Sequence, residues 1–346
     1  MESERILGQN HILRHFENAI RMGKISHAYI INGEEGSGKM NLAIHFAKAL
    51  QCERNNSNKA INEDGERITV PGTACGQCKS CKQTDSKNQP DIKYITYEKS
   101  GIGVDEIREQ INDDIDIKPY SSPYKIYIVP ESEKMTVQAQ NALLKTIEEP
   151  PEYAIIILLT TNADTFLQTI LSRCVMLNIR PVKEDIIKNQ LTSQYGVGDY
   201  EARVAATFSN GNPGKAIKLA TSEEFKELKQ YVVGMFMSLE KGGMDIIGEA
   251  IKKTGTFKKQ IDEYFSLMRI WFRDILVYKA TKEEDQIIFQ DEYMTIEKMS
   301  QTYSFDDIND ILKAIDLAES RIKSNVNFDS TIEILLLSIK EKTSEK

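Results

Sequence analysis

The chain has 346 residues, of which 40% are hydrophobic and 28% charged, a composition typical of a globular protein with two or three domains. Its 52 acidic and 44 basic side chains give a net charge of −8, so the chain as a whole does not attract nucleic-acid phosphates. The longest apolar run, residues 154–159, is too short to cross a membrane, and the first ten residues do not form a signal peptide. We therefore expect a cytoplasmic protein with no membrane partner.

Helix and strand patterns alternate in the first part of the chain. Residues 9–24 carry apolar side chains at helical spacing, and residues 27–32 form a short apolar strand that leads into a glycine-rich loop. Further strands are expected at 125–130 and 153–160, with an amphipathic helix over 136–149 between them. This order predicts an α/β module with a parallel sheet that is covered on both faces by helices.

The pattern changes at residues 179–185, and only helical periodicity follows. Residues 260–280 and 306–323 carry apolar side chains three and four positions apart. The C-terminal half is therefore predicted to consist of small helical bundles.

The glycine-rich loop matches the phosphate-binding pattern G-x-x-x-x-G-K-[ST] up to its last position. Gly33, Gly36, Ser37, Gly38 and Lys39 are the candidate nucleotide-binding residues, because such a loop turns its backbone N–H groups toward phosphate oxygens and its lysine toward the terminal phosphates. The strand before the loop and the helix after it provide the context that this motif requires.

Two positions depart from what a hydrolysing enzyme needs. Met40 stands where a Ser or Thr hydroxyl would bind Mg²⁺, and its thioether is a poor ligand for a hard cation. Pro130 stands at the end of a strand, where an acidic residue would hold the same metal. Glu131 and Glu133 follow, either as catalytic acids or as acids favoured in the first turn of a helix. The Mg²⁺ site is therefore expected to be lost, and whether ATP still binds stays open.

Four of the five cysteines crowd one segment with the spacing C-x22-C-x2-C-x2-C. Cys52, Cys75, Cys78 and Cys81 can supply four thiolates to one tetrahedral ion, which predicts a closed structural Zn²⁺ site in a reducing compartment. The polar residues 53–74 between the first two cysteines read as a mobile insertion. Cys174, beside apolar residues, reads as an ordinary buried cysteine.

Four stretches together carry a family resemblance: 25–39, the cysteine segment, 135–151 and 169–174 with its sequence "TILSRC". They closely resemble the delta-prime subunits of the bacterial sliding-clamp loader, an AAA+ family within the DNA polymerase III holoenzyme. The specific motifs cover about the first two hundred residues, and the helical remainder is similar only in architecture.

The resemblance implies three domains: an AAA+ P-loop domain at 1–178 with the inserted zinc knuckle at about 52–81, a helical lid at 179–222 and a helical collar for oligomerisation at 223–346. It also implies that Ser172 and Arg173 belong to a motif whose arginine acts in trans on ATP held by a neighbouring motor subunit. A guanidinium suits this role, because it has a permanent charge and a rigid fork of donors. Gly214 stands where active motors carry a lid arginine, which is a third missing catalytic part.

The resemblance thus implies a non-hydrolysing, stator-like clamp-loader subunit without ATPase activity of its own. Its implied partners are the gamma/tau motor subunits and the delta subunit, with the sliding clamp and primer-template DNA reached through the complex. An autonomous gamma/tau-like ATPase that uses Lys39 and Glu131 is the alternative. A zinc-dependent nucleic-acid-binding module is disfavoured by the net charge and by the lack of basic and aromatic residues around the cysteines. Ring position, stoichiometry and direct contacts to clamp or DNA do not follow from the sequence.

Overall fold

The computed structural model describes residues 6–56, 71–98, 101–241 and 245–344, and its contacts divide the chain into two compact units. The first unit contains residues 1–187 together with 210–215, and the second contains 188–209 and 216–346. Most of the predicted insertion, residues 57–70, lies outside the described residues. We describe each unit by itself.

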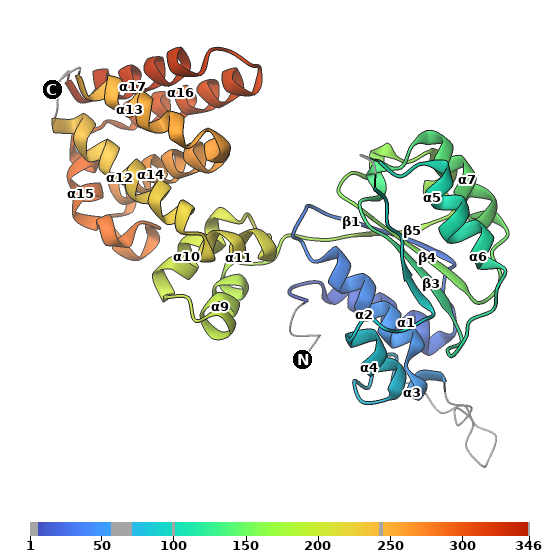
Figure 1. Cartoon of the computed structure of the whole chain (residues 1–346). Helices are drawn as coiled ribbons and strands as arrows, with labels where there is room; N and C mark the ends of the chain where they lie inside the picture. The colour runs from blue at the N-terminus through green and yellow to red at the C-terminus, as the bar shows by residue number, and fades with distance from the viewer. Residues whose placement is uncertain (1–5, 57–70, 99–100, 242–244, 345–346) are drawn as a thin grey trace. The chain divides into compact units, whose positions relative to one another are not determined.

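The first unit is built on a five-stranded sheet whose strands all run parallel in the order β2-β3-β4-β1-β5 (Figure 1). The strands are β1 (Ala28–Asn32), β2 (Ile92–Tyr94), β3 (Lys125–Val129), β4 (Ala154–Thr160) and β5 (Val175–Asn178). Strands β3 and β4 are buried along their whole length, as expected for the centre of a sheet covered on both faces. The parallel fold class predicted from the sequence is confirmed.

Helices cover both faces of this sheet (Figure 1). Tyr29 and Ile31 of β1 pack toward α1 and α2. Ala28 and Ile30 pack on the opposite face of the sheet, with the α5–α8 segment. Alternate residues of this strand therefore belong to two different hydrophobic clusters. The helices of this unit are α1 (Asn10–Met22), α2 (Lys39–Gln51), α3 (Glu53–Asn56), α4 (Lys79–Asp85), α5 (Val104–Ile107), α6 (Asp113–Ile115), α7 (Val137–Glu148) and α8 (Gln168–Leu171), and α9 (Glu184–Tyr195) begins at its end.

The described part of the second unit is helical (Figure 1). Its core contains an aromatic cluster, in which Trp271 and Phe272 of α14 pack against Phe236 of α12. The remaining helices are α10 (Asp199–Phe208), α11 (Pro213–Thr221), α12 (Glu223–Lys241), α13 (Asp245–Thr256), α14 (Ile261–Thr281), α15 (Tyr293–Thr302), α16 (Phe305–Lys323) and α17 (Phe328–Ser344). Within the described ranges, we find no helix that is both long and apolar enough for a membrane span.

Candidate functional site

The phosphate loop joins the carboxyl end of β1 to the first turn of α2. Gly36 and Gly38 have φ angles of 77° and 94°, which lie in the left-handed region that favours glycine. Gly33 has no room for a side chain, since a Cβ there would lie 2.9 Å from both Ile179 Cβ and Ser37 Oγ. The glycines therefore build the backbone of the predicted phosphate loop.

Lys39, however, bonds to its own loop. Its ammonium donates hydrogen bonds to the carbonyl oxygens of Gly33, at 2.5 Å, and Glu34, at 2.8 Å. Burial lowers the pKa of Lys39 below its ordinary value, while the nearby Glu133 carboxylate acts in the opposite direction. The ammonium that would meet a terminal phosphate thus makes two hydrogen bonds to backbone oxygens of its own loop.

A second segment, residues 210–215, lies directly against the phosphate loop. The Gly214 N–H donates to the Gly36 carbonyl at 3.1 Å, and the Asn212 side-chain amide donates to the Glu35 carbonyl at 2.7 Å. A Cβ on Gly214 would meet the Gly36 oxygen at 2.4 Å, so this approach requires glycine. The close approach of the two backbones therefore explains why residue 214 is a glycine, independently of the expected loss of a lid arginine.

Met40 packs as a core residue. Its partly buried side chain lies against the cluster formed by α1, α2 and one face of the sheet. The residue after the phosphate-loop lysine therefore contributes apolar packing at this position, where a metal-binding loop would have a hydroxyl.

The two acids after β3 are held by local partners. Glu131 has a left-handed backbone, with φ 46°, and its carboxylate accepts a hydrogen bond from the Tyr97 hydroxyl and pairs with Lys134 at 3.0 Å. The Tyr97 bond, followed by the Lys134 contact, lowers the pKa of Glu131. Glu133 accepts hydrogen bonds from the Thr161 hydroxyl, at 2.8 Å, and from the Thr161 backbone N–H, at 3.2 Å. Both carboxylates thus take part in hydrogen bonds at the ends of β3 and β4.

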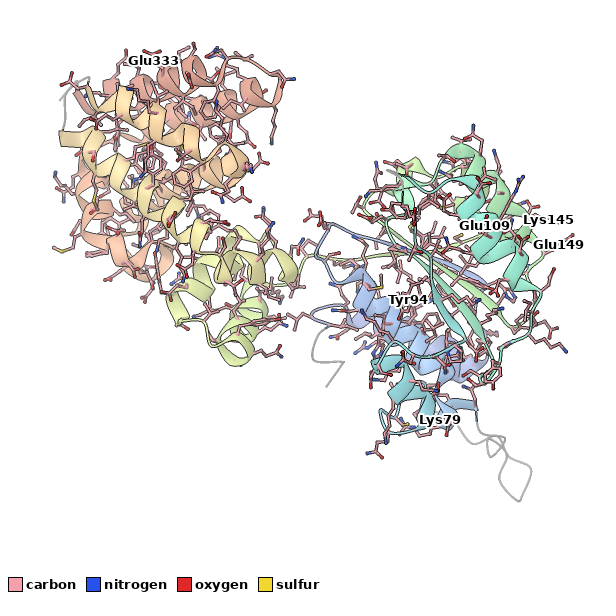
Figure 2. All side chains as sticks on the ribbon, viewed as in Figure 1. Lys79, Tyr94, Glu109, Lys145, Glu149 and Glu333 are labelled. Carbon is pink, nitrogen blue, oxygen red and sulfur yellow. The ribbon has the colours of Figure 1, made fainter. Side chains whose placement is uncertain are left out.

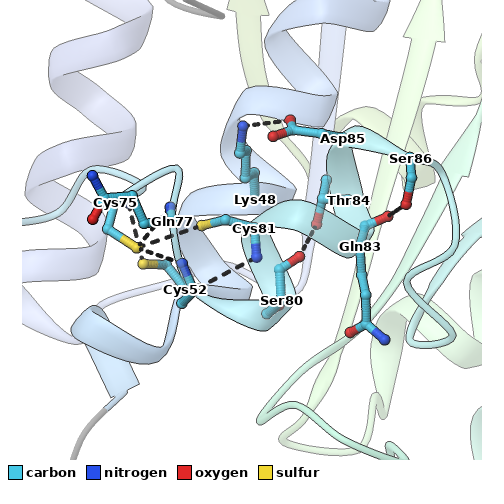
Figure 3. A network of polar contacts seen from close by, with 11 residues as sticks. Lys48, Cys52, Cys75, Gln77, Ser80, Cys81, Gln83, Thr84, Asp85 and Ser86 are labelled. Carbon is cyan, nitrogen blue, oxygen red and sulfur yellow. Dashed lines mark hydrogen bonds and ion pairs between the residues drawn. The ribbon is translucent and has the colours of Figure 1, made fainter.

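The four clustered cysteines converge at the opposite end of α2 (Figure 3). Cys52 follows α2, Cys78 caps α4, and the sulfur atoms of Cys52, Cys75, Cys78 and Cys81 all lie within 4.8 Å of one another. Tetrahedral Zn–S bonds of about 2.3 Å place sulfur atoms about 3.8 Å apart, so the separation suits one shared ion. All four are free thiols, and the structure brings together the complete set predicted from the sequence.

Backbone N–H groups point at these sulfurs. The Cys78 N–H donates to Cys75 Sγ at 3.3 Å, the Cys81 N–H to Cys78 Sγ at 3.4 Å, and the Cys75 N–H to Cys52 Sγ at 3.3 Å. The N–H of Gln77, followed by that of Cys78, lowers the pKa of Cys75 to about 6, whereas burial raises the pKa of Cys52 and Cys81. Such N–H···S contacts stabilise thiolates around a cation, so the donor set fits a structural zinc ion.

The cluster is fixed to the module by several other contacts. Lys48 of α2 pairs with Asp85 at the end of α4 (Figure 3), and Arg21 of α1 donates to the Pro71 carbonyl at 2.8 Å. Gly72, with φ 78°, lies so close to α1 that a Cβ would meet the Glu17 carbonyl at 2.6 Å. The knuckle is therefore tied to the helices on one face of the sheet.

Arg173 lies between α8 and β5, where its side chain is 40% exposed. Its guanidinium pairs with Glu148 at 3.0 Å and donates to the Thr169 carbonyl at 3.1 Å and the Ser172 hydroxyl at 3.3 Å. Ser172 itself donates to the Thr169 carbonyl. Burial raises the pKa of the neighbouring Cys174 to about 12, and its side chain packs against the core on the α7 side of the sheet.

Three contributors to these sites were not predicted from the sequence. Asn212 is polar and stands between two glycines in a loop, Tyr97 lies in an irregular segment, and Glu148 looks like one of several surface acids. Only the Asn-Pro-Gly sequence at 212–214 marks a turn, and no sequence signal indicates what that turn contacts.

The strand order, the loop after β1 and the helices on both faces define a P-loop module of the AAA+ type, followed by helical segments. A profile of the family "DNA polymerase III, delta subunit" matches residues 8–183, and its "C terminal" counterpart matches 248–341. The chain therefore belongs to the DNA polymerase III delta subunit family.

Individual proteins agree with this assignment. DNA polymerase III subunit delta' of Bacillus subtilis (strain 168) is 26% identical over 337 residues, which are 96% of either chain. DNA polymerase III subunit tau of the same organism is 34% identical over 221 residues, or 62% of this chain, but the match spans only 36% of tau. A solved gamma-subunit-related protein of Thermotoga maritima aligns with 96% of this chain and 99% of its own at 21% identity and a TM-score of 0.41.

Proposed function

We propose that the chain is a non-hydrolysing, stator-like subunit of a DNA polymerase III clamp loader. The observation that carries this proposal is the state of the phosphate loop, where the Lys39 ammonium is bonded to two carbonyl oxygens of its own loop. The packing of Met40 in the core adds to it, because no hydroxyl is left for Mg²⁺ at that position. The chain then assists the loading of a sliding clamp on primed DNA without turning over ATP as an isolated protein.

We further propose that Arg173 acts on ATP held by a neighbouring motor subunit. A side chain that is 40% exposed can reach a partner, and a guanidinium stabilises the charge on transferring phosphoryl oxygens. Ser172 contributes by accepting a hydrogen bond from the same guanidinium. The partners under this proposal are gamma/tau motor subunits and a delta subunit, and the clamp and primer-template DNA are engaged through the assembled complex.

The cysteine cluster has a structural role in this proposal. Four thiols that surround one point leave no open position for substrate, so a bound zinc ion would hold the 71–85 segment on α2 and take no part in phosphoryl transfer. For the remainder of the chain, we propose the division suggested by the family resemblance: the AAA+ domain at 1–178, a lid at 179–222 and a collar at 223–346 through which subunits associate.

The test is the replacement of Arg173 by Ala in a reconstituted clamp loader. The variant should assemble and keep its zinc, because the Glu148 pair is partly exposed and contributes little to stability. The ATPase rate of the complex and its rate of clamp loading should fall. An arginine finger contributes on the order of 10³-fold at its own site, and a ring with several active sites loses the share that depends on this interface.

Arg173→Lys is the matched variant, and it should also be impaired, because an ammonium keeps the charge but lacks the planar fork. A mutant complex that assembles normally and loads clamps at the wild-type rate would show that Arg173 has no role in trans.

The similarity to tau supports one alternative, an autonomous gamma/tau-like ATPase that uses Lys39 and Glu131. The contacts of these two side chains with their own surroundings weigh against it. A steady-state ATPase assay on the isolated chain separates the two proposals. Magnesium-dependent turnover that disappears in Lys39→Ala would favour the motor.

A further inference from the structure

The guanidinium of Arg173 is held from two directions. Thr169 and Ser172, in the turn just before it, accept hydrogen bonds from one terminal nitrogen. Glu148, the last residue of α7, pairs with the other terminal nitrogen at 3.0 Å. The carboxylate is thus the contact that fixes Arg173 relative to a different helix.

The helix macrodipole makes a carboxylate electrostatically unfavourable at position 148. Glu148 occupies the C-terminal end of a 12-residue helix, where the macrodipole disfavours a carboxylate and favours a cation. Glu149 follows, and Pro150 then prevents the helix from continuing. The macrodipole does not favour an acid at this site, and the ion pair with Arg173 offsets that cost for Glu148.

A buried side chain connects the two elements that carry this ion pair. Gln140 of α7 is 2% exposed, and its side-chain amide accepts from the Leu167 N–H at 2.9 Å and donates to the Thr165 carbonyl at 3.1 Å. These bonds connect α7 directly to the segment that leads into α8. Glu148 and Arg173 therefore lie on two elements whose relative placement is fixed by a buried group.

The Glu148–Arg173 ion pair does little for stability, because its two side chains are 45% and 40% exposed. The ion pair does restrict the conformation of Arg173, because a long side chain has fewer accessible rotamers when its end group is bound. One terminal nitrogen of Arg173 uses both of its N–H groups for Thr169 and Ser172, and the Nε–H group makes none of these contacts and remains for another acceptor.

We propose that Glu148 is the positioning residue of Arg173: it holds the guanidinium in one orientation, with its Nε–H group free for a phosphate oxygen of a neighbouring subunit. The proposal rests on the proposed role of Arg173 in trans. Prior ordering lowers the entropic cost of reaching the transition state, so the expected effect is on the rate of turnover rather than on the binding of ATP by the neighbour.

The test compares Glu148→Gln, Arg173→Ala and the double variant in the complete reconstituted clamp loader. Glu148→Gln should lower kcat for ATP by about threefold to tenfold, since the arginine loses its charged anchor, and should leave KM within about twofold. The double variant should be no slower than Arg173→Ala alone, because a positioning residue has no effect once its target is gone.

Glu149→Gln is the matched control, since it removes the same charge from the adjacent position. Glu149 is exposed at the end of α7, as Figure 2 shows, and its carboxylate is not the one paired with Arg173. This control should turn over ATP at the wild-type rate. The melting temperature and assembly of both glutamine variants should match those of the wild type.

The outcomes distinguish this inference from the proposed function. Normal turnover in Arg173→Ala would overturn both. Slow turnover in Arg173→Ala with normal turnover in Glu148→Gln would overturn only the positioning role. A double variant slower than Arg173→Ala, or a loss of assembly in Glu148→Gln, would show that Glu148 acts independently of Arg173.

Discussion

Helix α2 has a sequence motif at each of its ends, and the two motifs differ in the contacts that their polar groups make. At its start, the glycine backbone of the phosphate loop is intact, but Lys39 is bonded to carbonyl oxygens and the 210–215 segment lies against the loop. At its end, four thiols converge, and their contacts are with one another and with backbone N–H groups. At the first site the Lys39 ammonium bonds to carbonyl oxygens of its own chain, whereas at the second the four sulfur atoms surround a point that suits one shared ion. The sequence motif thus predicts the backbone conformation of each site, and the contacts of its polar side chains indicate whether the site still needs a bound ligand.

The largest effect is expected from removing one thiol of the cluster. Cys78→Ser should reduce bound zinc from about one ion per chain to close to none, because a structural site needs its four ligands. The knuckle at 71–85 should loosen and become sensitive to protease, while the helix and strand content of the sheet persists. Metal analysis, limited proteolysis and circular dichroism measure these effects.

Cys174→Ser is the control for that experiment, because Cys174 lies outside the cluster. It should keep the full zinc content. Zinc that is absent from the wild type, or unchanged in Cys78→Ser, would rule out the site.

A smaller effect should follow from adding a methyl group where the 210–215 segment meets the phosphate loop. Gly214→Ala places a Cβ 2.4 Å from the Gly36 carbonyl oxygen, so the two backbones must separate. Overpacking of this kind costs about 1–3 kcal/mol in the free energy of unfolding. Chemical denaturation provides the measurement.

Gly248→Ala is the matched substitution, since a Cβ at Gly248 in α13 meets nothing within 4 Å. It should stabilise the chain slightly, because alanine is the better helix former. Equal stability of Gly214→Ala and wild type would mean that the segment does not lie against the loop in solution.

Restoring the missing hydroxyl alone should not restore an enzyme. Met40→Thr removes a partly buried apolar side chain and should cost about 1 kcal/mol of stability, while magnesium-dependent ATP turnover stays at background. Pro130 still lacks a metal-binding group, and Lys39 still has its carbonyl partners. Turnover that appears in this single variant would contradict the account of the loop.

The smallest effect concerns Glu131. Its pKa is lowered, first by the Tyr97 hydroxyl and then by Lys134, so its stabilising contribution is present above the ordinary pKa of a glutamate and is lost as the pH falls. Because this carboxylate is 54% exposed, Glu131→Gln should change stability by about 0–1 kcal/mol at neutral pH and by still less in acid. Denaturation curves at two pH values test this, and a catalytic Glu131 would instead be revealed by lost turnover.

The sequence predicted the main architecture because its signals were local and strong. The run at 153–160 is apolar throughout, and strand β4 lies within it, buried at every position. Strands β2 and β5 were missed, since they have only three and four residues and are partly exposed, so neither periodicity nor a long apolar run marks them. The four cysteine ligands were identified as a set because their spacing is short and their side-chain type is rare.

The remaining parts of the sites depend on contacts between distant segments. The Gly214–Gly36 hydrogen bond joins positions far apart in the chain, and neither the phosphate-loop motif nor the missing lid arginine predicts that these two glycines meet. Arg173 was singled out only by the family resemblance, and no sequence pattern connects it with Glu148. Their pairing follows from how α7 and α8 are packed through Gln140, which no local pattern reveals.

The parallel sheet also imposes an order of events during synthesis of the chain. Strand β1 ends at residue 32, and its neighbour β4 begins 122 residues later (154 minus 32), with β5 later still. At a synthesis rate of about 5–20 residues per second, about 6–24 s pass between the end of β1 and the start of its neighbour β4. All four cysteines are made by residue 81, well within that interval, and α4 packs on α2. Under the proposed structural role of zinc, a nascent chain can bind the ion and close its cysteine cluster before it has a sheet, whereas the phosphate loop gains its contact with Gly214 only after residue 214 has left the ribosome.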